Sequence, residues 1–156
     1  MSGERFRDGR ERIYEFADEV LVVCPGCGGC AVVSVVRRRL TCPSCGATRE
    51  ADGSALMYRA PVDPVFRRDV WLRADFRGHL LWAYNARHLE YLAAYVGARL
   101  RERGGDGFRP HTSMVERLPG WMNAAKNRDA LVRAFARMRA TLPAWASGDG
   151  VTREEG

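Results

Sequence analysis

Short apolar segments alternate with turns rich in glycine and proline in the first half of the chain. Residues 20–23 precede one such turn, residues 31–38 follow it, and residues 47–58 follow a second turn. Apolar runs of this length bounded by turn residues are typical of β-strands. Four of the five residues in 32–36 are valine, so a strand there needs cover on both faces. The pattern predicts a β-ribbon over residues 20–60 that packs against the rest of the chain.

A second β-hairpin is predicted over residues 69–84. Apolar residues recur at every second position before Arg77-Gly78, a dipeptide that suits a tight hairpin turn, and a continuous apolar run follows at 80–84. The apolar residues of the first strand are Val70, Leu72, Ala74 and Phe76. We expect them to share one face and to meet Leu80, Trp82 and Tyr84, or the neighbours of these residues, across the hairpin. Residues 60–68, which contain two prolines, are expected to connect the ribbon to this hairpin.

Two longer helices are predicted after the hairpin. Apolar residues recur every three or four positions over 86–103, where Asn85 can serve as the N-cap and a pair of glycines follows the last turn. The same spacing recurs over 128–142, after Asn127 and before a proline. Two shorter helical turns are expected between these helices. Strands followed by helices indicate an α+β fold.

Two Cys-Pro-x-Cys-Gly units give the strongest chemical signal. Cys24 and Cys27 belong to the first unit, and Cys42 and Cys45 to the second, with 14 residues between Cys27 and Cys42. Two sulfurs three positions apart on a tight turn can reach one ion, and the glycine that follows tolerates the left-handed backbone that turns N–H groups toward the thiolates. We expect the four sulfurs to form a closed tetrahedral site for one structural Zn²⁺.

Other uses of these cysteines fit the spacing less well. A ferredoxin-type iron–sulfur run would need a cysteine where Ser34 stands. A thioredoxin-type redox pair needs one CxxC at the start of a helix, whereas this chain has two in hairpin-like sequence. A single iron in the same four-sulfur cage stays an alternative, because the two units resemble those of rubredoxin. Cys30 opens an apolar run and is expected to be a buried thiol.

The chain is basic, and the excess charge lies in its second half. The net charge is +6, with 24 arginines and one lysine, and residues 85–142 carry 11 basic and five acidic side chains. A basic surface favours partners that carry phosphate. The candidate contacts are Arg37, Arg38 and Arg39 at the expected end of a ribbon hairpin, and Lys126, Arg133 and Arg137 on one side of the last helix. Both groups are also typical of the solvated surface of an arginine-rich chain.

Motifs of several enzyme classes are absent from the sequence. It contains no phosphate-binding GxxxxGK[ST] loop, no GxSxG elbow and no HExxH pair, and its three histidines are scattered. We therefore expect no enzymatic activity and no small-molecule substrate; a small enzyme built around His79, Trp82 and His88 stays an alternative. The apolar runs are too short to cross a bilayer and the N-terminal segment is charged, so we expect a cytoplasmic protein that binds no membrane.

The sequence also resembles bacterial proteins described as TFIIB-type zinc ribbon-containing proteins. The likeness covers residues 20–142. It is carried by the cysteine units and by the stretches at 81–92, 95–103, 117–122 (Arg-Leu-Pro-Gly-Trp-Met) and 125–129 (Ala-Lys-Asn-Arg-Asp). The resemblance implies that the four paired cysteines are metal ligands, and the family's name points to transcription. It assigns no role to the tryptophan and the lysine–asparagine motifs.

Together these patterns predict an N-terminal four-cysteine zinc ribbon of β-hairpins packed with a second β-hairpin and a C-terminal helical region. The expected divisions are a flexible charged arm (1–19), the zinc ribbon (20–60), the hairpin with helices packed on the ribbon (61–142) and a flexible tail (143–156). The predicted function is that of a non-enzymatic structural-zinc protein that binds nucleic acid through its basic helical body, in transcription or replication. The alternative is an adaptor that docks a protein partner and does not contact nucleic acid.

Overall fold

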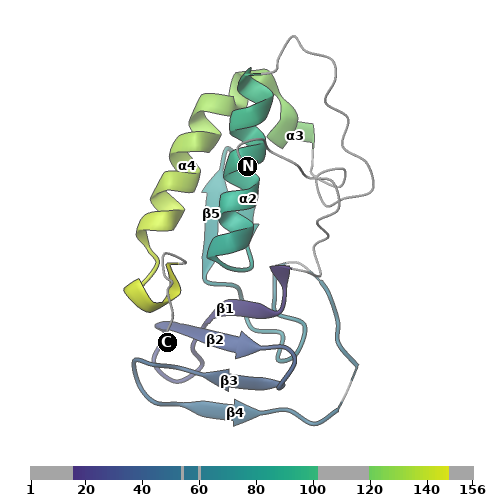
Figure 1. Ribbon diagram of the computed structural model, residues 1–156, viewed down its shortest axis with the longest axis vertical. Helices are drawn as coiled ribbons and strands as arrows, with labels where there is room; N and C mark the ends of the chain where they lie inside the picture. Colours follow the sequence, from purple (N-terminus) through teal and green to yellow (C-terminus); the bar gives the residue numbers. More distant parts are fainter. Residues whose placement is uncertain (1–15, 54, 60, 102–119, 148–156) are drawn as a thin grey trace, which may run out of the picture.

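The first four strands follow one another in a single antiparallel sheet of order β1-β2-β3-β4 (Figure 1). They are β1 (Glu19–Val23), β2 (Cys30–Ser34), β3 (Arg39–Thr41) and β4 (Thr48–Glu50). The computed structural model describes residues 16–53, 55–59, 61–101 and 120–147. Because sequential strands alternate in direction, the β1–β2 and β3–β4 loops lie at the same end of the sheet. The β2–β3 turn lies at the opposite end.

The β1–β2 ribbon has apolar contacts on both faces. Val20 and Val33 are fully buried in a cluster that Leu56, Val65 and Phe66 complete from the segment between β4 and β5. On the other face, Leu21 and the partly buried Val32 belong to the cluster formed with the helices. This arrangement confirms that the ribbon is covered on both sides, as its near-continuous apolar sequence predicts. Val36, in the turn after β2, is the exception, because 82% of it is exposed.

The second hairpin consists of β5 (Leu72–Phe76) and β6 (His79–Ala83). Arg77 and Gly78 form its turn with φ angles of 50° and 84°, the two positive values that a type I′ turn requires. Leu72 and Phe76 face the core as expected. Leu81 and Ala83 meet them from β6, whereas Leu80 points outward and is 38% exposed. The hairpin and the position of its turn are confirmed.

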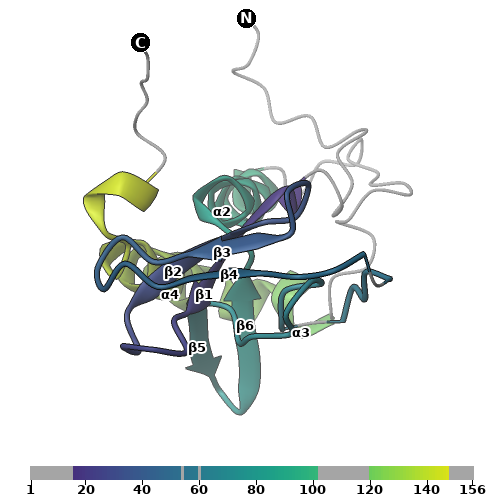
Figure 2. The ribbon, with the colours of Figure 1, turned by 90° about the horizontal axis from the view of Figure 1, so that it is seen from below.

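Helices α2 (Ala86–Arg101) and α4 (Arg128–Ala140) pack against each other and against this hairpin, behind the four-stranded sheet in Figure 2. Between them come α3 (Gly120–Asn123) and the 3-10 turn η2 (Ala125–Asn127). The facing side chains are fully or almost fully buried: Leu89, Leu92 and Val96 of α2, and Leu131, Phe135 and Met138 of α4. Both long helices are confirmed. Helix α4 ends two residues earlier than predicted, and the expected last two residues of α2 lie outside the described part of the chain.

The two N-cap predictions have different outcomes. Asn85 Oδ1 accepts a hydrogen bond from the backbone N–H of His88 at 2.9 Å, which is the expected cap of α2. Asn127 also stands just before its helix, but its side chain makes no capping hydrogen bond. It is buried and bonded to other partners. The position of the α4 start was therefore predicted, and the role of the Asn127 side chain was not.

Backbone hydrogen bonds join the ribbon to the second hairpin. The N–H of Leu21 donates to the carbonyl of Tyr84 at 2.8 Å, and the N–H of Trp71 donates to the carbonyl of Leu21 at 2.8 Å. The N–H of Val23 donates to the carbonyl of Asp69 at 3.0 Å. The outer edge of β1 is thereby paired with residues from the other half of the chain. This pairing positions the four-stranded sheet against the helices.

Part of the expected terminal segments is packed. Phe16 and Ala17, inside the predicted arm, are buried, and η3 (Ala144–Ala146) forms inside the predicted tail. Residues 1–15 and 148–156 lie outside the described residues, as does one of the two shorter helical turns expected between the long helices, at 113–116. Among the residues that the structure describes, no helix combines the length and the apolar character that a membrane crossing needs.

Candidate metal centre

The two cysteine loops have the same backbone geometry at the same end of the sheet. Each begins with a buried cysteine, Cys24 or Cys42. Its carbonyl accepts a hydrogen bond from the N–H of the glycine four positions later, at 3.0 Å in the first loop and 2.8 Å in the second. These glycines, Gly28 and Gly46, have φ angles of +79° and +80°, in the region that favours glycine. The local sequence therefore explains why both loops fold into the same tight turn.

The loops bring four sulfur atoms together. The Sγ atoms of Cys24, Cys27, Cys42 and Cys45 all lie within 4.8 Å of one another. Across the two loops, Cys24 Sγ lies 3.8 Å from Cys45 Sγ, and Cys27 Sγ lies 3.7 Å from Cys42 Sγ. A tetrahedral ion with metal–sulfur bonds of about 2.3 Å would place its sulfurs about 3.8 Å apart. The four cysteines could therefore hold one metal ion.

Backbone N–H groups donate to the sulfurs of the first loop and favour the charged form of Cys24. Cys24 Sγ accepts hydrogen bonds from the N–H groups of Cys27 at 3.5 Å and Gly26 at 3.2 Å, and Cys27 Sγ accepts one from Gly29 at 3.3 Å. The bond from Cys27 and then that from Gly26 lower the pKa of the Cys24 thiol to about 6, although burial opposes the change. A thiolate is the form that binds a metal.

The geometry is that of a closed site. Cys24 and Cys42 are buried, while Cys27 and Cys45 lie at the surface. Gly26 leaves no spare room beside the cluster, since a Cβ atom there would lie 3.7 Å from the sulfurs of both Cys24 and Cys45. Four protein ligands fill a tetrahedron and leave no position for a water molecule or a substrate. Such a site holds chain segments together and offers no open coordination position to a substrate.

The fifth cysteine stands apart from the cluster. Cys30 is only 5% exposed and packs among apolar residues that include Leu21 and Leu72. Burial, with a smaller contribution from Cys42, raises the pKa of the Cys30 thiol to about 12. The side chain is therefore a neutral thiol at physiological pH. The expectation that Cys30 is a buried thiol is confirmed.

The arginines near the β2–β3 turn differ in their exposure and in their ion pairing. Arg37 is exposed within the turn, and Arg38 is half-buried with a φ of 55°. Arg39, the first residue of β3, forms an ion pair with Glu50 of β4 at 2.7 Å. Its guanidinium is thus partly neutralised by a cross-strand neighbour, which makes it a weaker phosphate contact than the sequence suggested.

The second predicted basic group is exposed, but it does not form one helical stripe. Arg133 and Arg137 lie one turn apart on α4, and both are exposed. Lys126 is exposed in η2, before α4 begins, so the helical period cannot be counted through it. The structure does not bring this group together with the β2–β3 turn, which lies at the end of the four-stranded sheet away from the cysteine loops (Figure 1).

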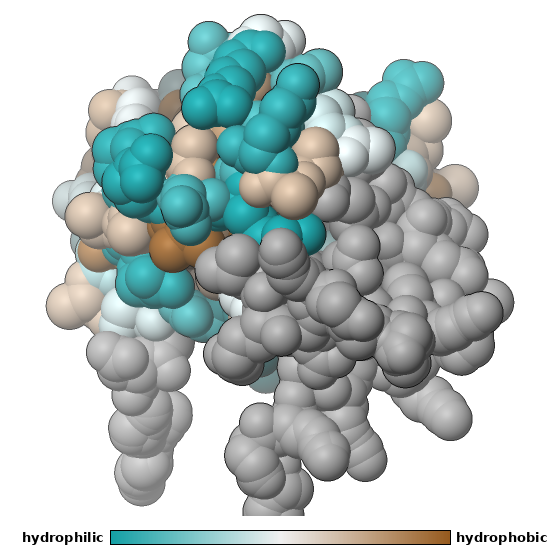
Figure 3. Space-filling view, turned by 90° about the horizontal axis from the view of Figure 1, so that it is seen from above, coloured by the Kyte–Doolittle hydropathy of each residue, from teal (hydrophilic) through white to brown (hydrophobic). Residues whose placement is uncertain are grey.

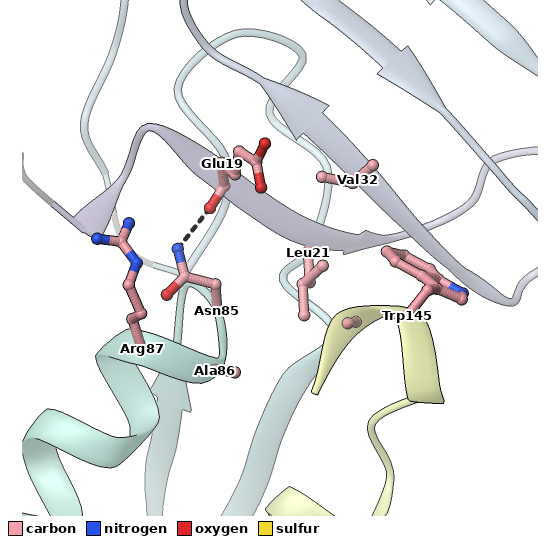
Figure 4. Close-up of a pocket in the computed structure, with 8 residues that line it drawn as sticks. Glu19, Leu21, Val32, Asn85, Ala86, Arg87 and Trp145 are labelled. Atoms are coloured by element: carbon pink, nitrogen blue, oxygen red, sulfur yellow. Dashed lines mark hydrogen bonds between the residues drawn. The ribbon is translucent and has the colours of Figure 1, made fainter. Parts of the chain in front are cut away.

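A groove lies between β1 and the start of α2, and Trp145 of η3 lines one side of it (Figure 4). Its volume is about 460 Å³. The polar groups at its edge already have partners within the protein. Asn85 Nδ2 donates to the carbonyl of Glu19 at 2.6 Å, and Arg87 pairs with Asp18 at 2.5 Å. The groove residues therefore join the segment before β1 to α2 and offer no evident acid–base pair.

Of the three residues considered for a small active site, Trp82 and His88 are in ring contact, with their centroids 5.5 Å apart. His88 is 3% exposed, and its ring stacks on that of Phe16 and lies tilted against that of Tyr84. Its Nδ1 accepts a hydrogen bond from the backbone N–H of Tyr84 at 2.8 Å. Burial, and secondarily the charge of Arg87, lower the pKa of His88 to about 3. His79 lies at the hairpin turn, stacked on Trp121.

The fold and the cysteine cluster define a β-ribbon protein with a candidate four-sulfur metal centre. Comparisons with family models, with curated proteins and with solved structures find no match to this chain. The resemblance to TFIIB-type zinc ribbon-containing proteins therefore stays a prediction. Function is inferred below from the site and from the charged surface of the molecule.

Proposed function

We propose that the protein is a non-enzymatic zinc-ribbon protein that binds nucleic acid through the basic side of its helical body. The observation that carries the nucleic-acid part is the contrast between two groups of cations. Arg39, Arg87 and Arg139 are neutralised by carboxylates of Glu50, Asp18 and Glu90. In the described part of the chain, the exposed side chains of Lys126, Arg133 and Arg137 form no ion pair.

Free cations on one side of a helix suit phosphate groups. Arg133 and Arg137 are one turn apart, and an arginine presents five N–H donors in a fixed fork that matches phosphate oxygens. Figure 3 looks onto the end of the molecule opposite the four-stranded sheet, where hydrophilic side chains gather over much of the described surface. The net charge of +6 adds long-range attraction for a polyanion.

The metal in this proposal is zinc. Four cysteine sulfurs in a tetrahedron are the donor set of structural zinc sites, and the 3.7 and 3.8 Å sulfur separations suit its bond length. Iron in the same cage is the competing occupant, since thiolates bind both metals. The closed geometry and the structural use of His88 support the absence of an enzymatic role.

The test compares two double variants with equal charge. Arg133→Ser/Arg137→Ser removes the free arginines of α4, and Arg49→Ser/Arg59→Ser removes two exposed arginines elsewhere. Binding of labelled DNA and RNA is measured by fluorescence anisotropy across a salt series. For the unaltered protein we expect a log–log salt slope of about −3 to −5, corresponding to four to six phosphate contacts. The α4 variant should lose about 1.4 to 1.8 of that slope, and the control should lose little.

Two results would contradict the proposal. One is a flat salt response or no binding at low salt, and the other is an equal loss of affinity in the two double variants. A protein partner that is captured from cell extract after nuclease treatment, without any affinity for nucleic acid, would support the adaptor alternative instead.

A further inference from the structure

The tip of the β5–β6 hairpin and the segment before α4 form one surface. The His79 and Trp121 rings lie parallel, with centroids 4.4 Å apart and planes 10° apart. Trp121 also stacks on Phe76, the cross-strand partner of His79, at 5.6 Å and 23°. Phe76 is buried, Trp121 is half-buried and His79 is exposed. The rings therefore form a stack that runs from the core to the surface.

The side chain of Asn127 holds the Arg77 guanidinium beside this stack. It is 5% exposed, and its Oδ1 accepts a hydrogen bond from Arg77 Nη1 at 2.5 Å. Its Nδ2 donates to the carbonyl of Trp121 at 2.9 Å. One buried amide thus ties the hairpin turn to the tryptophan segment and fixes one nitrogen of the Arg77 guanidinium. The Arg77 Cζ atom lies 5.3 Å from the centroid of the Phe76 ring.

The fixed guanidinium keeps donors for a ligand. Arg77 is exposed, and the bond to Asn127 uses one of the five N–H donors of an arginine. Lys126, the neighbour of Asn127 in η2, is also exposed. Arg77 therefore stands in the same hairpin turn as the exposed His79 ring, which stacks on Trp121, and Lys126 directly precedes the asparagine that holds Arg77. Immobilised side chains of this kind lose little entropy when a ligand binds.

We propose that this surface binds single-stranded nucleic acid, with one base stacked on the His79 ring and neighbouring phosphates held by Arg77 and Lys126. Aromatic rings beside cations are the common means by which proteins bind single strands, because every base has a flat face. In a duplex those faces are covered by neighbouring base pairs and only the base edges are reachable. The inference rests on the proposed function, and it adds the preferred form of the ligand and the residues that recognise it.

The test uses the full-length, metal-loaded protein and a labelled oligothymidylate of about 15 nucleotides, together with a duplex of the same length. The unaltered protein should bind the single strand more tightly. His79→Ala removes an exposed ring, and we expect it to weaken single-strand binding about 5-fold or more while duplex binding is unchanged. Leu80→Ala is the matched control, since Leu80 is the exposed neighbour on the same strand and points to the other face of the hairpin.

A second readout is the fluorescence of Trp121, the ring on which His79 stacks. Binding of the oligothymidylate should quench tryptophan emission, and Trp121→Phe, which keeps a ring at this position, should lose most of that change. Circular dichroism of each variant verifies that the fold is retained. Equal affinity of the unaltered protein for single strand and duplex, or equal affinities of His79→Ala and Leu80→Ala, would overturn this inference and leave the proposed function standing. An absence of binding to either ligand would remove both.

Discussion

At the scale of single residues, the buried side-chain amide of Asn85 fixes the start of α2. Asn85 Oδ1 caps α2, and Asn85 Nδ2 donates to the carbonyls of Phe16 and Glu19 at 2.5 and 2.6 Å. The cap could be predicted because it depends only on residues three positions apart. The other two bonds could not, because their acceptors lie more than 60 positions away in the sequence. A local pattern carries no information about such partners.

His88 gives a prediction about pH. It is buried and neutral, with its Nδ1 accepting the Tyr84 N–H, and its pKa is lowered from 6.5 to about 3 by burial and then by Arg87. Below about pH 6.5 the unfolded chain takes up a proton that the folded protein does not. The free energy of unfolding should therefore decrease as the pH falls from about 6.5 toward 3, by up to about 1.4 kcal/mol per pH unit from this group.

The measurement is urea unfolding between about pH 7 and about pH 5. His88→Gln is the comparison, because a glutamine carries an acceptor for the Tyr84 N–H and does not titrate. Loss of metal in acid affects both proteins, so the difference between their slopes isolates the histidine. We expect the variant to show the shallower decrease in stability. Parallel curves would mean that His88 is protonated inside the fold.

At the scale of the elements, the cysteine loops depend on glycines with a left-handed backbone. Gly28 has a φ of +79°, and a Cβ atom added there would meet nothing within 4 Å. Gly28→Ala therefore tests the backbone strain alone, and we expect a loss of about 1–2 kcal/mol in the free energy of unfolding. Gly53→Ala is the control, since that position is equally open and its φ is outside the left-handed region. Urea unfolding of both variants provides the measurement, and equal stabilities would contradict the strain argument.

The sequence predicted elements well where their determinants are local. The turn of the second hairpin needs two residues with positive φ, and Arg77-Gly78 indicated it correctly. The basic stripe was predicted less well, because the helical period was extended back to Lys126. The chain forms a 3-10 turn there, before α4 begins at Arg128. The burial of the Asn127 amide between the hairpin and α3 gives a physical reason for that break.

At the scale of the whole molecule, the connector between the ribbon and the second hairpin contributes to the core. Asp63 is fully buried, and its carboxylate accepts backbone N–H groups of Val65, Phe66 and Arg68 at 2.8, 2.6 and 2.8 Å. This turn places Val65 and Phe66 against the second face of the ribbon. The sequence indicated only a proline-containing connector. The sequence predicted that this face of the ribbon must be buried. It did not predict that Val65 and Phe66 bury it, because that depends on how the chain folds back.

Strand β1 couples the stability of the candidate metal centre to that of the helices. Cys24 and Cys42 are buried in the same apolar cluster as Val20 and Val22, whereas Leu21 belongs to the cluster of the helices. A single strand thus contributes to both cores. If the ion is removed, four thiols remain crowded without their common ligand, and the cluster around Cys24 loses its support. We expect the sheet and the helices to lose stability together.

The prediction is a single unfolding transition that a strong chelator shifts to lower temperature. It is followed by far-ultraviolet circular dichroism for the helices and by tryptophan fluorescence for the packing around them. Elemental analysis should find one equivalent of zinc in the unaltered protein and in Cys30→Ala, and less in Cys45→Ser. Because ferric thiolate absorbs visible light and zinc does not, a coloured protein would identify iron as the occupant. Helices that melt unchanged after the metal is removed would instead show that the two cores are stable independently, in spite of the strand they share.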